Sequence, residues 1–302
     1  MTPQVHHSFQ TPRWKDLLAL SKPEVTFLVV IAAAASYFLG ASRFSFFTLF
    51  HTILGTALLS GGTATWNHFL ERRSDAQMKR TMNRPLPSGR LQPAAAWWLG
   101  LLLSGGGTLW LWSFVNPLTS LIGGLALLSY LGIYTPLKRR TSACTFIGAF
   151  PGAAPALMGW TAATGKIEAE GLYLFLLLLV WQFPHFLAIA WIYREDYQRA
   201  GMIMLPPSDT SGEKTFRRIL GSTLALLPLS MIPVRTGEAS LFYWVPVLLL
   251  GAGFLAVAFR SSRGKTRQQA MAVLHASVLY LPLLYSVIIL NQLFDSHFRL
   301  LP

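Results

Sequence analysis

Three oxygen-bearing side chains recur at intervals of four residues where a long apolar run gives way to a polar segment. They are Asn67, Glu71 and Asp75. If the run continues as a helix, residues four apart share one face, so the three oxygens point the same way. Carboxylates in that arrangement can hold Mg²⁺, which takes one or two carboxylates together with phosphate oxygens and water. The spacing therefore predicts a magnesium site that binds a phosphorylated ligand.

Two arginines follow, four residues apart from each other. Arg80 and Arg84 can grip phosphate oxygens through the guanidinium fork. The Pro-Leu-Pro-Ser-Gly run at 85–89 is expected to end the helix sharply and to turn both arginines back over the carboxylates. A solvated loop with ion pairs four residues apart is the alternative. The segregation of acidic from basic residues, and the amide of Asn67 at the membrane border, favour the site.

The elements that must position these residues are membrane helices. The chain is 53% hydrophobic and only 12% charged, whereas a soluble domain carries about twice that charged fraction. A bilayer requires about 20 apolar residues per helix. Nine such runs occur, over 25–42, 46–66, 94–115, 118–135, 143–163, 171–192, 218–234, 241–259 and 271–294. Runs so long and apolar exclude barrel strands, so the predicted fold is an all-α bundle of nine transmembrane helices.

The distribution of Lys and Arg sets the expected orientation. The N-terminal tail and the loops after the even-numbered spans hold 21 of the 25, and the other loops with the C-terminal tail hold 4. Because positive loops stay cytoplasmic, we expect a bacterial inner (cytoplasmic) membrane protein with its N-terminus inside and its C-terminus external. The predicted parts are a cytoplasmic tail over 1–24, a membrane domain over 25–294 and an external tail over 295–302. The net charge of +13 is then explained by the Lys and Arg residues retained on the cytoplasmic side and by a site for an anionic substrate. No nucleic acid is expected as a partner.

The first polar segment resembles a known motif. Asn-x₃-Glu-x₃-Asp followed by Arg-Thr-x₂-Arg-Pro-Leu, over 67–86, is similar to the first aspartate-rich motif of the intramembrane aromatic prenyltransferase superfamily. The resemblance implies nine helices in a bundle around a central cavity that opens to the cytoplasmic side. The nine spans counted from hydropathy agree with it.

A second stretch is similar to one branch of that superfamily, the protohaem IX farnesyltransferases. Phe-Pro-His-Phe at 183–186 and Arg-Glu-Asp-Tyr-x₂-Ala-Gly-x₂-Met-Leu-Pro at 194–206 carry this resemblance. It implies that a farnesyl group passes from farnesyl diphosphate to a vinyl group of protohaem IX (haem B), giving haem O for terminal oxidase assembly. It also implies Mg²⁺ as cofactor, the lipid bilayer as surroundings, and haem A synthase or terminal oxidase assembly proteins as partners.

The second polar loop departs from the wider superfamily at one position. Many members have a second Asp-x₃-Asp, but here Asp196 is followed four residues later by Ala200. Glu195 and Asp209 are the candidates for the missing oxygen. The resemblance implies that Asp196 binds a second Mg²⁺ or orients the first.

Four more side chains complete the expected site. The loop at 134–141 resembles the superfamily's Tyr-x₃-Lys-Arg segment, which implies that Lys138 and Arg139 bind the diphosphate; retention of positive charge inside is the alternative. His185 lies about 12 Å into the membrane if its span is helical. At that depth an imidazole needs a partner, so haem contact and a hydrogen bond to another helix are equally favoured. His68 borders the metal face and is expected beside it.

Two other functions fit parts of the pattern. One is a prenyltransferase of the same superfamily that acts on a quinone precursor. The other is a transporter, which predicts ionisable residues deep in several spans. Nearly all acidic residues fall in loops here, which disfavours transport.

Overall fold

Within residues 14–234 and 241–298, which the computed structural model describes, every regular element is a helix. In chain order these are α1 (Trp14–Leu20), α2 (Pro23–Gly40), α3 (Phe46–Asp75), α4 (Pro93–Phe114), α5 (Pro117–Ser129), the π-helix η1 (Tyr130–Tyr134), α6 (Thr135–Leu137), α7 (Cys144–Thr164), α8 (Ala169–Ile192), α9 (Arg194–Arg199), α10 (Glu213–Ser230), α11 (Leu241–Gly264) and α12 (Arg267–Phe298). The predicted all-α fold is confirmed.

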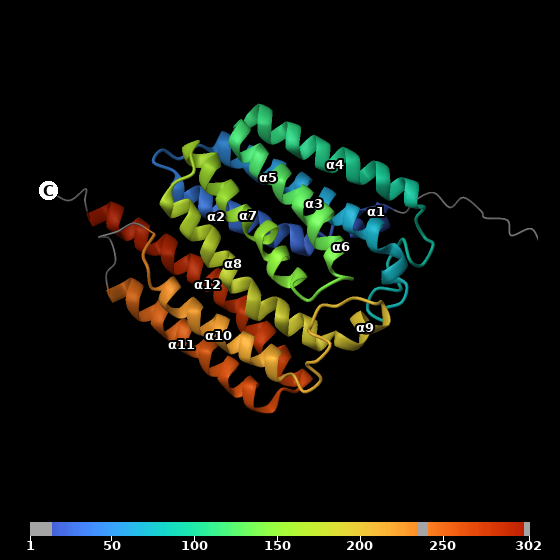
Figure 1. Ribbon diagram of the computed structural model, residues 1–302. Helices are drawn as coiled ribbons and strands as arrows, with labels where there is room; N and C mark the ends of the chain where they lie inside the picture. Colours follow the sequence, from blue (N-terminus) through green and yellow to red (C-terminus); the bar gives the residue numbers. More distant parts are fainter. Residues whose placement is uncertain (1–13, 235–240, 299–302) are drawn as a thin grey trace, which may run out of the picture.

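The long helices form a bundle in which α7 and α8 occupy the middle. α2, α3, α4 and α5 lie on one side of this pair, and α10, α11 and α12 lie on the other (Figure 1). α2 packs on α7, α3 packs on α4, and α8 contacts α7, α10 and α12. α9 contacts the loop after α3, so the two polar segments of the sequence meet at one end of the bundle.

Each of the nine predicted runs coincides with a helix, the fourth being the continuous course of α5, η1 and α6. Among the described residues, seven of these helices are long and apolar enough to cross a membrane, and the chain is therefore a multi-pass membrane protein. The two that fall short are α7 and α10. α7 is rich in Gly, Ala and Thr and is mostly buried against other helices, so it needs few lipid-facing side chains. α10 carries four charged residues in its first six. The number of nine crossings, and their orientation, stay predictions.

Helices extend into both segments predicted to be tails, and the sides of the membrane on which these segments lie stay predictions. Residues 14–20, assigned to the cytoplasmic tail, form α1, which contacts α3 and α4. α12 continues to Phe298, into the segment assigned to the external tail. The rest of both tails, 1–13 and 299–302, lies outside the described residues.

α3 carries the first motif, and its end differs from the prediction. The helix continues beyond its apolar part, so Asn67, Glu71 and Asp75 lie on one helix as expected. It ends at Asp75, however, well before Pro85. Thr81 Oγ1 donates to the Asp75 carbonyl oxygen over 2.8 Å, and a series of turns follows. Hydrogen bonds at the helix end, and not the proline run, therefore turn the chain back.

The close approach of α3 to α4 depends on two glycines. A Cβ at Gly62 would lie 2.5 Å from the backbone nitrogen of Ser104, and a Cβ at Gly107 would lie 2.6 Å from that of Leu59. Small residues at such crossings let membrane helices pack backbone to backbone. The position of α3 in the bundle therefore requires glycine at both sites.

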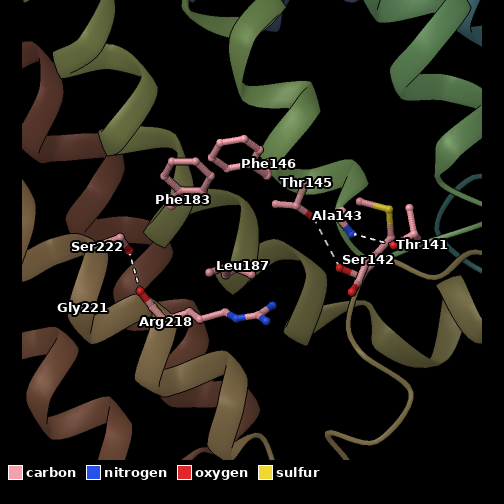
Figure 2. A pocket seen from close by; sticks show the side chains of 11 residues that line it. Thr141, Ser142, Ala143, Thr145, Phe146, Phe183, Leu187, Arg218, Gly221 and Ser222 are labelled. Atoms are coloured by element: carbon pink, nitrogen blue, oxygen red, sulfur yellow. Dashed lines mark hydrogen bonds between the residues drawn. The ribbon is translucent and has the colours of Figure 1, made fainter.

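On another face, the packing of α7, α8 and α10 leaves a cleft of about 580 Å³. Figure 2 shows the side chains that line it.

Replacing Gly62 with Val should lower the melting temperature of the detergent-solubilised protein. The added side chain meets backbone atoms of α4 that cannot rotate away, and overpacking of this kind costs roughly 1–3 kcal/mol. Gly106→Val is the matched control, because a Cβ at Gly106 on α4 has nothing within 4 Å. Equal melting temperatures for the two variants would contradict the close helix crossing.

Candidate active site

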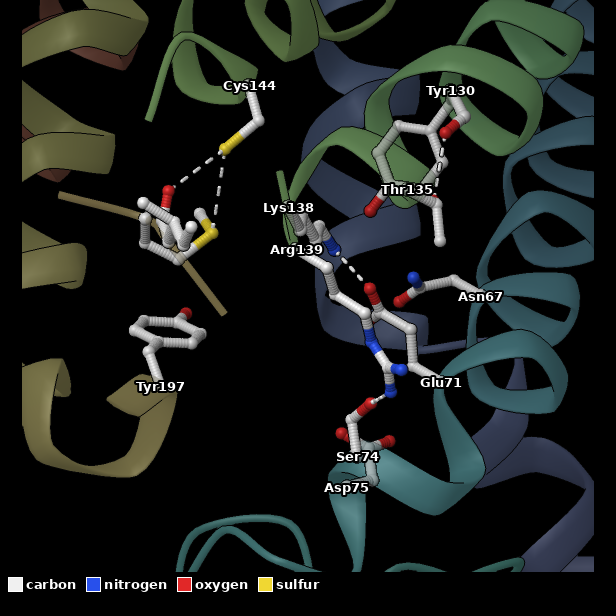
Figure 3. A network of polar contacts seen from close by, with 12 residues as sticks. Asn67, Glu71, Ser74, Asp75, Tyr130, Thr135, Lys138, Arg139, Cys144 and Tyr197 are labelled. Carbon is white, nitrogen blue, oxygen red and sulfur yellow. Dashed lines mark hydrogen bonds and ion pairs between the residues drawn. The ribbon is translucent and has the colours of Figure 1, made fainter. Parts of the chain in front are cut away.

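The face of α3 that carries the first motif is buried, and each of its three polar residues is bonded to a cation from a different segment. The bonds join Lys22 Nζ to Asn67 Oδ1 (3.0 Å), Lys138 Nζ to Glu71 Oε1 (2.7 Å) and Arg84 Nη1 to Asp75 Oδ2 (2.8 Å). Figure 3 shows the Glu71 carboxylate between Asn67 and Lys138. Removing charges from water is unfavourable unless they are paired, so these pairs are what permits two carboxylates on a buried helix face.

Arg139 joins the same group from the loop that follows α6. Its guanidinium donates to Ser74 Oγ over 2.5 Å, one residue before Asp75. The structure thus brings Lys138 and Arg139 to the motif on α3, as expected for residues that share one ligand.

A π-helix presents Lys138 to the site. η1 places the rings of Tyr130 and Tyr134 beside the ammonium group, whose nitrogen lies 5.9 and 4.5 Å from their centroids. The carbonyl oxygen of Lys138 accepts a hydrogen bond from Ile203 N over 2.6 Å. Single π-turns of this kind are common at functional sites. Aromatic faces attract a desolvated cation, which helps to keep this lysine charged although it is buried.

Asp196 connects the two polar loops. Its oxygens accept hydrogen bonds from the backbone nitrogens of Lys79 (3.1 Å) and Arg80 (3.3 Å), and it also pairs with the guanidinium of Arg199. A carboxylate bound in this way holds the first loop against α9. This geometry favours a positioning role for Asp196, and its role as a metal ligand stays a prediction.

Arg80 lies between the loops and does not contact the carboxylates of α3. Its guanidinium stacks over the ring of Tyr193, 4.4 Å from the centroid, and donates to Tyr197 Oη over 3.3 Å. Of the two arginines expected over the motif, only Arg84 reaches it in this structure.

The two candidates for the missing second oxygen have other surroundings than the buried Asp196. Asp209 caps α10, because its carboxylate accepts hydrogen bonds from the backbone nitrogens of Lys214 (3.0 Å) and Thr215 (2.7 Å). The side chain of Glu195 is 76% exposed. The second loop therefore contributes one buried carboxylate to this region, from Asp196.

The two histidines differ in their surroundings. His185 Nδ1 lies 2.9 Å from Ser277 Oγ on α12, and its ring stacks on that of Trp181. This is the predicted hydrogen bond to a neighbouring helix, and it engages one of the two ring nitrogens. His68 is buried and neither of its ring nitrogens has a hydrogen-bond partner. Asn67 Nδ2, next to it in the chain, is also buried without a partner.

The donor set fits a magnesium-bound diphosphate. In the described part of the chain, no group of three or more His, Cys, Asp or Glu side chains comes together as a complete metal site. Two carboxylates and an amide on one face suit Mg²⁺, which takes the remainder of its oxygens from phosphate and water. Four cations, Lys22, Arg84, Lys138 and Arg139, surround the two carboxylates of α3. This excess of positive charge attracts a polyanion.

Lys22 is a site residue that the sequence analysis did not identify. It precedes Pro23 in a left-handed conformation (φ 46°), which directs its side chain toward α3. The one feature of the sequence that could have identified Lys22 is its position immediately before the proline that starts a membrane helix. Burial, and then the charges of Arg84 and Lys138, lower the pKa of Lys22 to about 7.

Comparison with known proteins places the chain among prenyltransferases. Residues 28–295 match the model of the UbiA prenyltransferase family. The chain is 43% identical over 288 residues to the protoheme IX farnesyltransferase of Solibacter usitatus (strain Ellin6076), covering 92% of this chain and 99% of that protein. It is 44% identical over 277 residues to the protoheme IX farnesyltransferase of Salinibacter ruber (strain DSM 13855 / M31), covering 91% and 98%.

Solved structures share the fold at low sequence identity. A digeranylgeranylglyceryl phosphate synthase superposes with a TM-score of 0.76 at 16% identity, covering 92% of this chain and 98% of that one. A UbiA homologue from Archaeoglobus fulgidus, bound to GPP and Mg²⁺, superposes with a TM-score of 0.62 at 14% identity, covering 90% and 99%.

The affinity for farnesyl diphosphate should depend on the protonation of Lys22. An anion beside the ammonium raises its pKa, so binding is strongest where the free protein is already protonated, below about pH 7. As the pH rises above 7, affinity should fall by up to about tenfold per unit until the pKa of the bound state is reached. Lys22→Arg stays charged and should lack this fall. Identical pH profiles for the two proteins, measured as dissociation constants from pH 6 to 9, would exclude Lys22 from the site.

Proposed function

We propose that this chain, which belongs to the UbiA prenyltransferase family, transfers a farnesyl group from farnesyl diphosphate to a vinyl group of protohaem IX, giving haem O. The observation that carries the proposal is the buried face of α3, where two carboxylates and an amide meet three cations. Support for haem as the acceptor comes from the relatives named protoheme IX farnesyltransferase, which match more than nine-tenths of the chain.

In the proposed site, Asn67, Glu71 and Asp75 hold Mg²⁺, which supplies positive charge to the leaving diphosphate. Lys138 and Arg84 are bonded to carboxylates in the structure. On arrival of the ligand, Lys138 and Arg84 would transfer these bonds to phosphate oxygens, which would free the carboxylates of Glu71 and Asp75 to hold Mg²⁺. The exchange keeps every buried charge paired before and after binding, so binding leaves no charge desolvated and alone.

The chemical step is ionisation of the allylic carbon–oxygen bond. Arg84, Lys138, Arg139 and Lys22 stabilise the negative charge that develops on the diphosphate, and preorganised charges in a water-excluded site are effective at this. The vinyl group of the haem then attacks the farnesyl cation, which forms the new carbon–carbon bond and leaves a cation beside the porphyrin ring. Water adds to that cation and loses a proton, giving the hydroxyethylfarnesyl side chain. A site within a membrane bundle limits premature capture of the farnesyl cation by water.

We assign supporting roles to the second loop. Asp196 orients the first loop through the amides of Lys79 and Arg80, with a second Mg²⁺ at Asp196 as the alternative. Arg80 binds diphosphate if it leaves its stack on Tyr193.

Two histidines are proposed to face the haem. The bond between His185 and Ser277 fixes the imidazole and leaves Nε2 for the iron or a propionate. His68 is the second candidate, because its buried ring nitrogens have no partner. The bacterial inner membrane as location, and haem A synthase or oxidase assembly proteins as recipients of the product, belong to the same proposal.

Membranes that contain the protein should move label from farnesyl diphosphate to protohaem IX and not to hydroxybenzoate. The two acceptors separate haem farnesylation from transfer to a quinone precursor, and pigment extraction with chromatography measures the product. Label found only on the benzoate would exclude the haem acceptor, and a protein that leaves farnesyl diphosphate intact while moving a solute would be a transporter.

Asp75→Ala and Arg84→Ala should each reduce transfer by about 10²–10³-fold, the loss typical of removing one preorganised electrostatic contact. Both variants should still insert, which the amount of protein in the membrane fraction measures. Glu195→Ala removes an exposed carboxylate from the neighbouring loop and is the control that should retain activity. Near-normal transfer by Asp75→Ala and Arg84→Ala would mean that the site lies elsewhere.

A further inference from the structure

The cleft between α7, α8 and α10 has no part in the proposed reaction. It encloses about 580 Å³ and is lined by residues of the 141–146 segment, of α8 and of α10, together with Met204. None of these residues contributes to the candidate active site. Its floor includes Met204, which packs in a buried cluster with Cys144, Ala190 and Met78. A layer of apolar side chains therefore backs the cleft on the side of the polar loops.

The lining has two chemically distinct parts. Phe146, Phe183 and Leu187 form an apolar wall, and the two rings stack with centroids 5.7 Å apart. At the other end Arg218 extends from α10 toward Ser142 (Figure 2). The cleft thus combines one cationic group with an apolar wall, which suits a ligand that has both an anionic and an apolar part.

Arg218 is not used within the protein. Among the described residues its guanidinium has neither an ion-pair partner nor a hydrogen bond. Ser222 Oγ, which also lines the cleft, donates to the backbone oxygens of Arg218 (2.7 Å) and Ile219 (3.1 Å). No lining residue is acidic. The loop that lines the cleft also carries Arg140 immediately before Thr141. The electrostatic preference of this end of the cleft is therefore for an anion.

The apolar part is continuous with the lipid-facing surface. Phe146 is 55% exposed, Phe150, one turn further along α7, is 45% exposed, and Leu224 on α10 is 54% exposed. Exposed apolar residues on a membrane helix face acyl chains. The polar end lies at the start of α10, where charged residues occupy the first two turns. The cleft therefore runs from the level of the polar loops into the hydrocarbon.

We propose that this cleft binds one anionic phospholipid from the leaflet that borders the polar loops. The headgroup phosphate binds Arg218 and the hydroxyl of Ser142, and an acyl chain lies along Phe146, Phe183 and Leu187. Arginine suits a phosphate because its fork offers two parallel donors. The charge of Arg218 selects the headgroup, and the apolar wall distinguishes a lipid from free phosphate.

The test titrates the full-length protein, purified in a non-ionic detergent, with dioleoylphosphatidylglycerol or dioleoylphosphatidylcholine and counts bound lipid by native mass spectrometry. Phosphatidylglycerol should bind roughly tenfold more tightly than phosphatidylcholine. The phosphate of either lipid can accept a hydrogen bond from Arg218, but the choline cation cancels the net charge of phosphatidylcholine and repels the guanidinium. Arg218→Gln should lose this tenfold preference for phosphatidylglycerol. Arg217→Gln removes the same charge one residue away, outside the lining, and should change the affinity by less than about threefold.

A second pair of variants tests the apolar part independently of charge. Gly221 lines the cleft and has nothing within 4 Å of an added Cβ, so Gly221→Phe fills the space without a backbone clash. Gly253→Phe places the same ring on an equally open glycine of α11. We expect only Gly221→Phe to weaken the binding of phosphatidylglycerol.

Four results would overturn the proposal. The first is an equal loss of affinity in Arg217→Gln and Arg218→Gln, which would indicate general surface attraction, and the second is equal binding of both lipids. The third is displacement of lipid by millimolar inorganic phosphate, which would indicate a site for a free anion. The fourth is displacement by protohaem IX, which would indicate a site for the acceptor. None of these measurements depends on farnesyl transfer, so a failure of the lipid site can be distinguished from a failure of the proposed function.

Discussion

Charges on the buried face of α3 have to be paired, and this constraint shapes the polar end of the bundle. Glu71 and Asp75 are both buried, and an unpaired carboxylate there would be strongly destabilising. The partner of Glu71 comes from the end of α6, 67 residues away, and the partner of Asp75 comes from the loop directly after α3. Lys22, from the turn before α2, binds Asn67 on the same face. Pairing these charges therefore also fixes where those segments lie.

The same constraint explains how a polyanion can be accommodated. A site that already holds paired charges can admit a metal and a diphosphate by exchanging partners, because the cations keep an anion beside them throughout. The surplus of positive side chains over carboxylates gives the anion a net attraction. Lys22 marks the limit of this arrangement, since burial and neighbouring cations lower its pKa to about 7. The site holds about as much positive charge as it can retain at neutral pH without its ligand.

Backbone contacts complete the arrangement by joining loops that belong to different halves of the chain. Asp196 accepts hydrogen bonds from two amides of the first loop, and the carbonyl of Lys138 accepts one from Ile203. The partners on the first loop and at Lys138 are backbone groups, so no side-chain motif predicts where these bonds form. They explain how Asp196 can stand alone without a second acidic residue four positions later, because its observed contacts need only one carboxylate.

The sequence by itself determined the helices and the chemical type of the site. Apolar runs predicted all nine long helices, and the interval of four predicted the shared face of Asn67, Glu71 and Asp75, because both properties follow from local periodicity. The family resemblance was confirmed by comparison. Only the tertiary structure decided that Arg84 reaches Asp75 whereas Arg80 stacks on Tyr193, that Lys22 joins the site, and that η1 is a π-helix. These outcomes depend on which distant segments meet in space, and a pattern of neighbouring residues carries no information about that.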